Sequence, residues 1–256
     1  MSIRPIEWMA FSRLGLTTLV MAVTILCMGL TTPSFAAGGG GGGGGAGLEG
    51  AGGGSGKQRA LASYQKGESL RNRGIKLLQK AAQAADAEEK TEAFEDAVKQ
   101  FGRAVREYKK AARRDKKFHQ AHNGIGFAQR MLALCQEQLG RPDDARKSFE
   151  AALAAYDKAL SIEPDFPHAI EYRGEAYMRL GRLDDAKGAY MALFADHREL
   201  ADMLMKKMRA WVDLQKERPS KIPADQLQAF STWVEERVEI AEQTAALVDG
   251  EAPHTW

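Results

Sequence analysis

Apolar side chains in the central part of the chain recur every three to four residues. One clear run consists of Ala145, Phe149, Ala152, Leu153, Tyr156, Ala159 and Leu160. A period near 3.6 residues, without two-residue alternation, indicates amphipathic helices. The segment 57–244 is rich in helix-forming residues, and its few prolines separate the apolar runs. The pattern predicts an all-α fold with helices at about 58–84, 90–115, 118–139, 143–162, 167–180, 183–216 and 224–246.

The apolar pattern also repeats along the chain. Eight residues recur at a constant offset of 48 positions: Phe101, Ala104, Tyr108, Ala111, Phe118, Ala121, Gly126 and Ala128 are matched by Phe149, Ala152, Tyr156, Ala159, Phe166, Ala169, Gly174 and Ala176. A second echo, offset by 41 positions, links residues 140–145 to residues 181–186. In both segments a glycine is expected to close one helix and an aspartate to cap the next. The repetition predicts antiparallel helix hairpins stacked in a row, each covering the apolar face of its neighbour.

The repeated residues resemble the tetratricopeptide repeat (TPR). The residues similar to its first helix are Gly174, Ala176, Tyr177, Leu180 and Gly181, followed by Ala186 and Tyr190 at the start of the second; Tyr156, Ala159 and Pro164 resemble the close of the preceding repeat. The resemblance covers about residues 90–195. The chain departs from the family's 34-residue period because both helices of the central hairpin are longer by about two helical turns. An elongated central hairpin is therefore expected.

The resemblance implies a short TPR-like solenoid, with a C-terminal helix packed as a cap. It also implies a concave groove, lined by the first helix of each repeat, that takes up a peptide or a helix of a partner protein. The matching positions are Gln120, Asn123, Phe127, Arg130, Met131, His168, Glu171, Glu175, Met178 and Arg179. The alternative for each single position is an ordinary solvated side chain. Trp211 and Trp233 are expected to belong to the capping helices.

The N-terminal residues have the zones of a secretory signal peptide. Arg4 and Arg13 precede an uncharged apolar run at residues 14–30, and Ser34 and Ala36 place small residues at the −3 and −1 positions of a cleavage site. We predict a signal peptide at 1–36, cleaved after about Ala36, and a periplasmic or secreted bacterial protein. The alternative is an uncleaved anchor, because 17 apolar or small residues approach the length that spans a bilayer.

The next segment is dominated by glycine. Residues 37–56 hold 14 glycines in 20 positions, which predicts a flexible linker at 37–57 with a reach of about 25 Å. A helical repeat domain at 58–216 and a C-terminal capping helix and tail at 217–256 complete the predicted organisation. No later apolar run approaches membrane length, so the mature domain is not expected to span a membrane.

The predicted function is a protein-binding adaptor or scaffold with no cofactor or metal, and not an enzyme. One alternative is a structural envelope protein that self-assembles into homo-oligomers through its hairpins, and another is an enzyme acting on cell-wall polymers. A formal net charge of +2 argues against nucleic acid as the partner. His119 and His122 lie three residues apart but lack further ligands for a metal.

Two smaller features remain open. A cationic cluster closes one predicted helix and consists of Lys109, Lys110, Arg113, Arg114, Lys116 and Lys117. It indicates either a solvated helix end, where cations complement the helix dipole, or a surface for an acidic partner or an anionic envelope. Cys135 is the one cysteine after the predicted cleavage site, and its leucine neighbours predict a buried, unreactive thiol.

Overall fold

The computed structural model describes residues 53–217 and 222–248, and these ranges form eight helices and no strand. The helices are α2 (Gly53–Gln83), α3 (Ala87–Arg114), α4 (His119–Gln138), α5 (Pro142–Ile162), α6 (Pro167–Arg179), α7 (Leu183–Phe194), α8 (Arg198–Lys216) and α9 (Ala224–Val248). The all-α prediction is confirmed. The predicted signal peptide at 1–36 and most of the predicted linker at 37–57 lie outside the described residues. α2 begins five residues before the predicted helix start.

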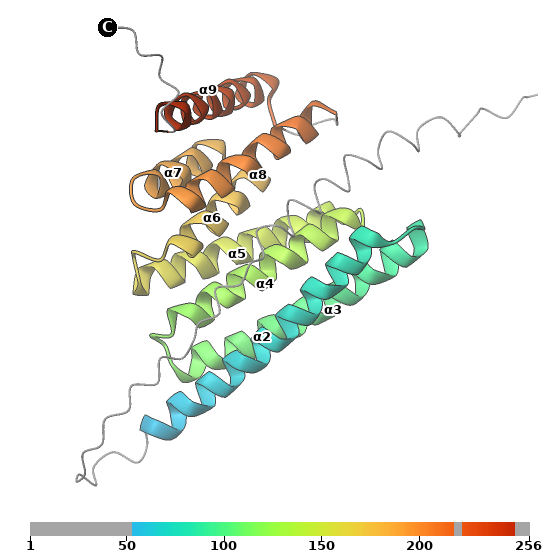
Figure 1. Cartoon of the computed structure of the whole chain (residues 1–256). Coiled ribbons are helices and arrows are strands. Elements are labelled where there is room, and N and C mark those ends of the chain that lie inside the picture. The colour runs from blue at the N-terminus through green and yellow to red at the C-terminus, as the bar shows by residue number, and fades with distance from the viewer. Residues whose placement is uncertain (1–52, 218–221, 249–256) are drawn as a thin grey trace, which may run out of the picture. The chain divides into compact units, whose positions relative to one another are not determined.

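The chain divides into two compact units, one ending at Pro164 and the other beginning at Asp165. In the first unit α2 pairs with α3, α4 pairs with α5, and α3 packs against α4 (Figure 1). In the second unit α6 pairs with α7, α8 contacts both of them, and α9 packs on α8 (Figure 1). Each unit has the hairpin packing of a TPR-like solenoid. The predicted boundary at residue 217, between the repeat domain and the C-terminal capping helix and tail, stays a prediction.

Residues paired by the 48-residue repetition have the same degree of burial in the structure. Fourteen of the sixteen repeated residues are buried, and the exceptions are Phe118 and its equivalent Phe166, which are both half-buried. These two phenylalanines are the N-cap residues of α4 and α6, respectively. Equivalent sequence positions therefore have equivalent packing roles, as stacked repeats require.

Close packing between the helices depends on aromatic rings lying against glycines. The Tyr108 ring of α3 lies against Gly67 of α2 and Gly124 of α4, where an added Cβ would come within 2.6 and 2.8 Å of the ring. The Tyr156 ring lies against Gly126 in the same way, with an added Cβ at 2.5 Å. Because no side chain separates ring from backbone, these helices approach closely and bury both tyrosines.

The two glycines at the hairpin turns act as the sequence predicts. Gly140 and Gly181 have φ angles of 68° and 75°, in the left-handed region that glycine adopts without a Cβ penalty. The amides of Arg141 and Arg182 donate hydrogen bonds to carbonyls five residues earlier, at 2.8 and 2.9 Å. This is the Schellman arrangement that satisfies the last carbonyls of a helix.

The predicted aspartate caps are wrong. The N-cap residues of α5 and α7 are Arg141 and Arg182, and neither makes a side-chain capping hydrogen bond. The aspartates at 143, 144, 184 and 185 lie inside the first turn of their helices. There, a carboxylate complements the positive end of the helix dipole and pairs with a nearby cation, as Asp185 does with Arg182 at 2.7 Å.

The central hairpin is elongated, as the departure from the 34-residue period predicts. α4 and α5 contain 20 and 21 residues, whereas α6 and α7 contain 13 and 12. The elongation is not limited to this hairpin, because α2 and α3 contain 31 and 28 residues.

The predicted single helix at 183–216 is wrong, because the chain folds there as α7 and α8. The break falls at residues 195–197, where the His197 amide donates to the Leu193 carbonyl at 2.8 Å. The His197 ring also lies 3.1 Å from the Asp165 carboxylate at the start of the unit. Neither glycine nor proline marks the break, so local sequence carries no stop signal there.

Helix α9 covers one end of the core of the second unit, as expected of a C-terminal capping helix. Phe230 and Val234 of α9 are buried against α8, and the Phe230 ring meets Trp211 edge-on with 5.9 Å between centroids. The Trp233 ring meets Tyr190 of α7 at 5.5 Å. Within the described ranges, no helix combines the length and apolar character needed to cross a membrane.

Cys135 of α4 is fully buried, and burial raises the pKa of its thiol to about 12. Because only the thiolate attacks disulfide reagents, we expect no reaction of native protein with 5,5′-dithiobis(2-nitrobenzoate) at pH 8 on a timescale of minutes. In denaturant, where the thiol regains its ordinary pKa, we expect rapid labelling of Cys135. Rapid native labelling of this residue, identified by peptide mapping, would contradict the burial.

Candidate functional site

The five predicted groove residues of α4 share one side of the helix but differ in accessibility. Gln120 and Asn123 are half-buried. Phe127, Arg130 and Met131 are buried, with exposed fractions of 5%, 2% and 0%. On this predicted groove side of α4, a partner can therefore touch the first turns directly, around Gln120 and Asn123.

A network between α2, α3 and α4 lies beside these residues. Two guanidinium groups contact the Phe127 ring, with Arg71 of α2 at 5.4 Å and Arg130 at 5.2 Å from its centroid. Arg71 pairs with the Glu68 carboxylate at 2.7 Å, and the Tyr108 hydroxyl donates to the same carboxylate at 2.5 Å. The sequence analysis missed Glu68 and Arg71, because α2 lies outside the clear repeat.

Burial is the main cause of the raised pKa values of Tyr64 and Tyr108 in this network. Burial first, and the adjacent Glu68 carboxylate second, raise the pKa of Tyr64 to about 12 and raise the pKa of Tyr108 further. Both hydroxyls therefore stay protonated near neutral pH and serve as hydrogen-bond donors. Glu68 pairs with Arg71 and accepts the Tyr108 hydroxyl, so the network forms a support for the α4 surface rather than a reactive site.

In the second unit, two predicted groove residues form a buried ionic cluster. Lys207 Nζ of α8 lies 2.6 Å from Glu171 Oε1 and 2.9 Å from Glu175 Oε2 of α6. The two glutamate side chains are 1% and 2% exposed, and the lysine side chain is 13% exposed. Lys207 Nζ also lies 5.6 Å from the centroid of the Tyr172 ring. The cluster joins α6 to α8 and offers little surface to a partner.

The other predicted groove residues of α6, like those of α4, include both buried and half-buried side chains. Met178 is fully buried in the core of the second unit. His168 and Arg179 are half-buried, and the His168 ring stacks on Tyr172 with 6.2 Å between centroids. Four of the ten predicted residues thus keep accessible surface: Gln120, Asn123, His168 and Arg179. Their role in binding a partner stays a prediction.

Asn123 has one feature that points to an external ligand. Its Oδ1 atom is buried and accepts no hydrogen bond from any described residue. A buried acceptor without a donor costs free energy, and because Asn123 as a whole is only half-buried, rotation of its amide would expose this oxygen to a donor of a bound peptide.

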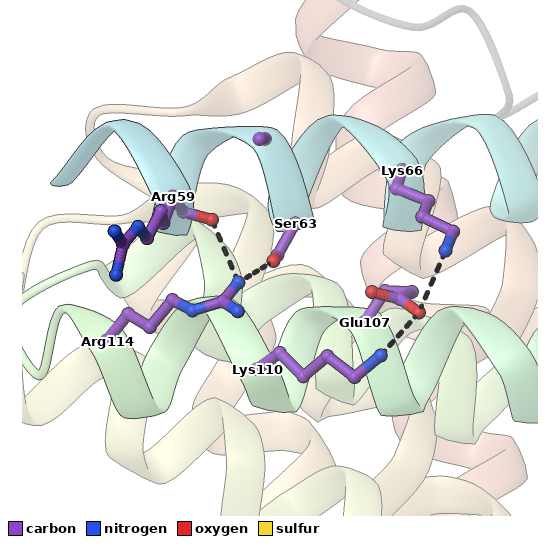
Figure 2. A pocket seen from close by; sticks show the side chains of 7 residues that line it. Arg59, Ser63, Lys66, Glu107, Lys110 and Arg114 are labelled. Atoms are coloured by element: carbon purple, nitrogen blue, oxygen red, sulfur yellow. Dashed lines mark hydrogen bonds and ion pairs between the residues drawn. The ribbon is translucent and has the colours of Figure 1, made fainter. Parts of the chain in front are cut away.

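A separate open cleft lies between the start of α2 and the end of α3 (Figure 2). Arg114 Nη1 donates to the Arg59 carbonyl at 3.0 Å and to the Ser63 hydroxyl. Glu107 accepts a hydrogen bond from Lys110 at 2.8 Å and pairs with Lys66 at 3.4 Å, and these cations lower the pKa of its carboxyl. The sequence analysis identified the α3 half of this basic region but missed the α2 half.

The described ranges contain no group of three or more His, Cys, Asp and Glu side chains positioned to hold a metal ion. His122 is partly buried, and this burial lowers the pKa of its ring.

One family model matches part of the chain. Residues 145–181 match the family model of the TPR repeat, within the region where the sequence resembles that repeat. The match runs through most of α5 and all of α6. No curated protein matches the chain. TPR repeats mediate binding of protein partners and are generally scaffolds rather than enzymes, which supports a role in protein–protein interaction.

Proposed function

We propose that this tetratricopeptide-repeat protein is a periplasmic adaptor that holds a peptide or a helix of a partner protein along α4. The observation that carries the proposal is the surface around Gln120 and Asn123. Its side chains are polar and half-buried, and Asn123 Oδ1, which is turned inward, has no donor among the described residues, so rotation of the Asn123 amide toward a partner would give this oxygen a donor. An extended or helical segment supplies such donors from its backbone or side chains.

The support beside this surface limits rearrangement of the backbone on binding. Arg71 and Arg130 both contact the Phe127 ring, and the Glu68 carboxylate pairs with the Arg71 guanidinium. A preorganised surface loses little conformational entropy when it binds a ligand, so more of the contact energy appears as affinity.

The periplasmic part of the proposal is supported by the N-terminal sequence alone. The basic start, the apolar run at 14–30 and the small residues at 34 and 36 are typical of a cleaved signal peptide. All of these residues lie outside the described ranges. Mass analysis of the N-terminus of the protein recovered from cells tests this part separately.

Photo-crosslinking in living cells tests the α4 surface. We expect a benzoylphenylalanine at position 120 to give a discrete crosslinked product with a second protein, because position 120 would lie in contact with the bound segment. Introducing Asn123→Ala into the same chain should reduce the yield of that product about tenfold, the effect of losing one well-placed hydrogen bond of about 1.5 kcal/mol. The measurement is the crosslinked fraction on an immunoblot.

The matched control places the crosslinker at position 150, which is exposed on α5. Identical products from positions 120 and 150 would indicate non-specific proximity. They would contradict binding of the partner at the α4 surface. We avoid substituting Phe127 or Arg130 in this test, because both are buried and their loss would disturb packing.

A further inference from the structure

Positive charge is concentrated where α2 begins and α3 ends. The segments 57–66 and 103–117 contain eleven lysines and arginines and only two acidic residues, Glu107 and Asp115, a net charge of +9. The whole chain has a net charge of +2, so all other residues together carry −7. The lysines and arginines of these two segments are termed the basic surface below.

The cations of α3 lie on one side of the helix. At about 100° per residue, those between positions 103 and 114 fall within an arc of about 140°. The buried residues of α3, such as Phe101, Tyr108 and Ala111, occupy the opposite side. Arg59 and Lys66 of α2 extend the same surface across the open cleft (Figure 2). The basic surface is thus continuous over two helices and faces outward.

Most of this charge is not neutralised within the protein. Glu107 is the carboxylate that pairs with the basic surface, through Lys66 and Lys110. Arg114 is held by neutral oxygen atoms, the Arg59 carbonyl and the Ser63 hydroxyl, which leave its charge uncompensated. The ion pairs of the described residues do not include Arg106, Lys109 or Arg113, and all three are exposed.

Helix termination does not explain this arrangement. The favourable effect of a cation at a helix C-terminus falls off within the last turn. α3 ends at Arg114, so Arg103, Arg106 and Lys109 lie outside its last turn. Mutual repulsion of close like charges opposes the compact state. An anionic partner accounts for charges that otherwise only destabilise the fold.

We propose that the basic surface binds the anionic phospholipid headgroups of a membrane. Two observations favour a membrane over an acidic peptide. The surface is an open, outward helix face rather than an enclosed groove. The apolar run at 14–30 is separated from the start of α2 by only 22 residues.

The position of that apolar run matters for the proposal. The glycine-rich sequence before α2 predicts a reach of about 25 Å, so a bilayer holding the run would lie within reach of the basic surface. After cleavage, the basic surface itself would provide reversible attachment to the same bilayer. This inference does not rest on the adaptor role, because the α4 surface around Gln120 contributes nothing to it.

Vesicle sedimentation with the full chain tests the proposal. The readout is the ratio of the partition coefficients on phosphatidylglycerol-containing and pure phosphatidylcholine vesicles, because insertion of the apolar run contributes to both. We expect a ratio far above one at low salt that falls in 0.5 M NaCl. The triple variant Arg106→Gln, Lys109→Gln, Arg113→Gln should lower the ratio about a hundredfold, since each cation near an anionic surface contributes about fivefold.

The matched control removes three exposed cations elsewhere, with Arg146→Gln, Lys158→Gln and Lys206→Gln, and should keep the wild-type ratio. Unchanged helical circular dichroism in both variants shows that folding is intact. A wild-type ratio near one, or equal ratios for the two triple variants, would overturn the proposal. Binding of wild type to immobilised polyglutamate but not to anionic vesicles would assign the surface to an acidic protein and would equally overturn it.

Discussion

Replacing Lys207 with methionine is expected to lower the free energy of unfolding of the second unit by about 3–5 kcal/mol. The Lys207 ammonium lies 2.6 Å from Glu171 and 2.9 Å from Glu175, and both carboxylates are almost completely buried. Methionine is similar in length and apolar, so the change removes the shared cation without creating a large cavity. The cost then comes from two carboxylates kept in a poorly solvated site without that cation.

The same substitution at the neighbouring position provides the control. Lys206 is exposed on α8, and Lys206→Met should change stability by no more than about 0.5 kcal/mol. Urea denaturation followed by circular dichroism at 222 nm measures both variants. Equal stability of the two variants would show that the buried ionic cluster does not hold α6 to α8.

Replacing Gly126 with alanine is expected to destabilise the first unit by about 1–3 kcal/mol. An added Cβ would lie 2.5 Å from one ring carbon of Tyr156 and 2.6 Å from another. The Tyr156 ring is fully buried between α4 and α5 and cannot move away without shifting a helix. Alanine has the higher helix propensity, so a loss of stability at this position would come from the steric conflict alone.

Gly102 on α3 is the matched control in the same unit. An added Cβ there would meet one atom of Leu132 at 3.9 Å, an ordinary contact. Gly102→Ala should therefore stabilise the unit by about 0.5–1 kcal/mol. Thermal and urea unfolding of the two variants give the comparison. A stabilising Gly126→Ala would contradict the close approach of α4 and α5.

The residues in these two predictions differ in whether their roles could be predicted from the sequence. Gly126 is identifiable from the 48-residue repetition, because close helix packing requires small residues at fixed positions. Lys207 was not identified, because α8 carries no clear repeat signature. The pairing of Lys207 with α6 joins residues more than thirty positions apart, which no local pattern specifies.

The residues of the candidate site could be predicted only in part from the sequence. Resemblance to the repeat selected one side of α4 and of α6, but it did not distinguish accessible residues from buried ones. Phe127, Arg130, Met131, Glu171, Glu175 and Met178 are buried. Burial depends on what the neighbouring helices place over a position, so helical phase alone does not determine it. Glu68 and Arg71 were missed because α2 lies outside the clear repeat.

Apolar periodicity, the constant 48-residue offset and the two turn glycines determined the helical class, the hairpin repetition and most helix boundaries. These features act through local conformation and the need of each amphipathic helix to bury one face. The tertiary structure alone decided the break between α7 and α8, the Glu171–Lys207–Glu175 cluster and the joining of α2 and α3 cations into one basic surface. Each of these depends on contacts between residues distant in the chain, whose energies arise only when the helices pack.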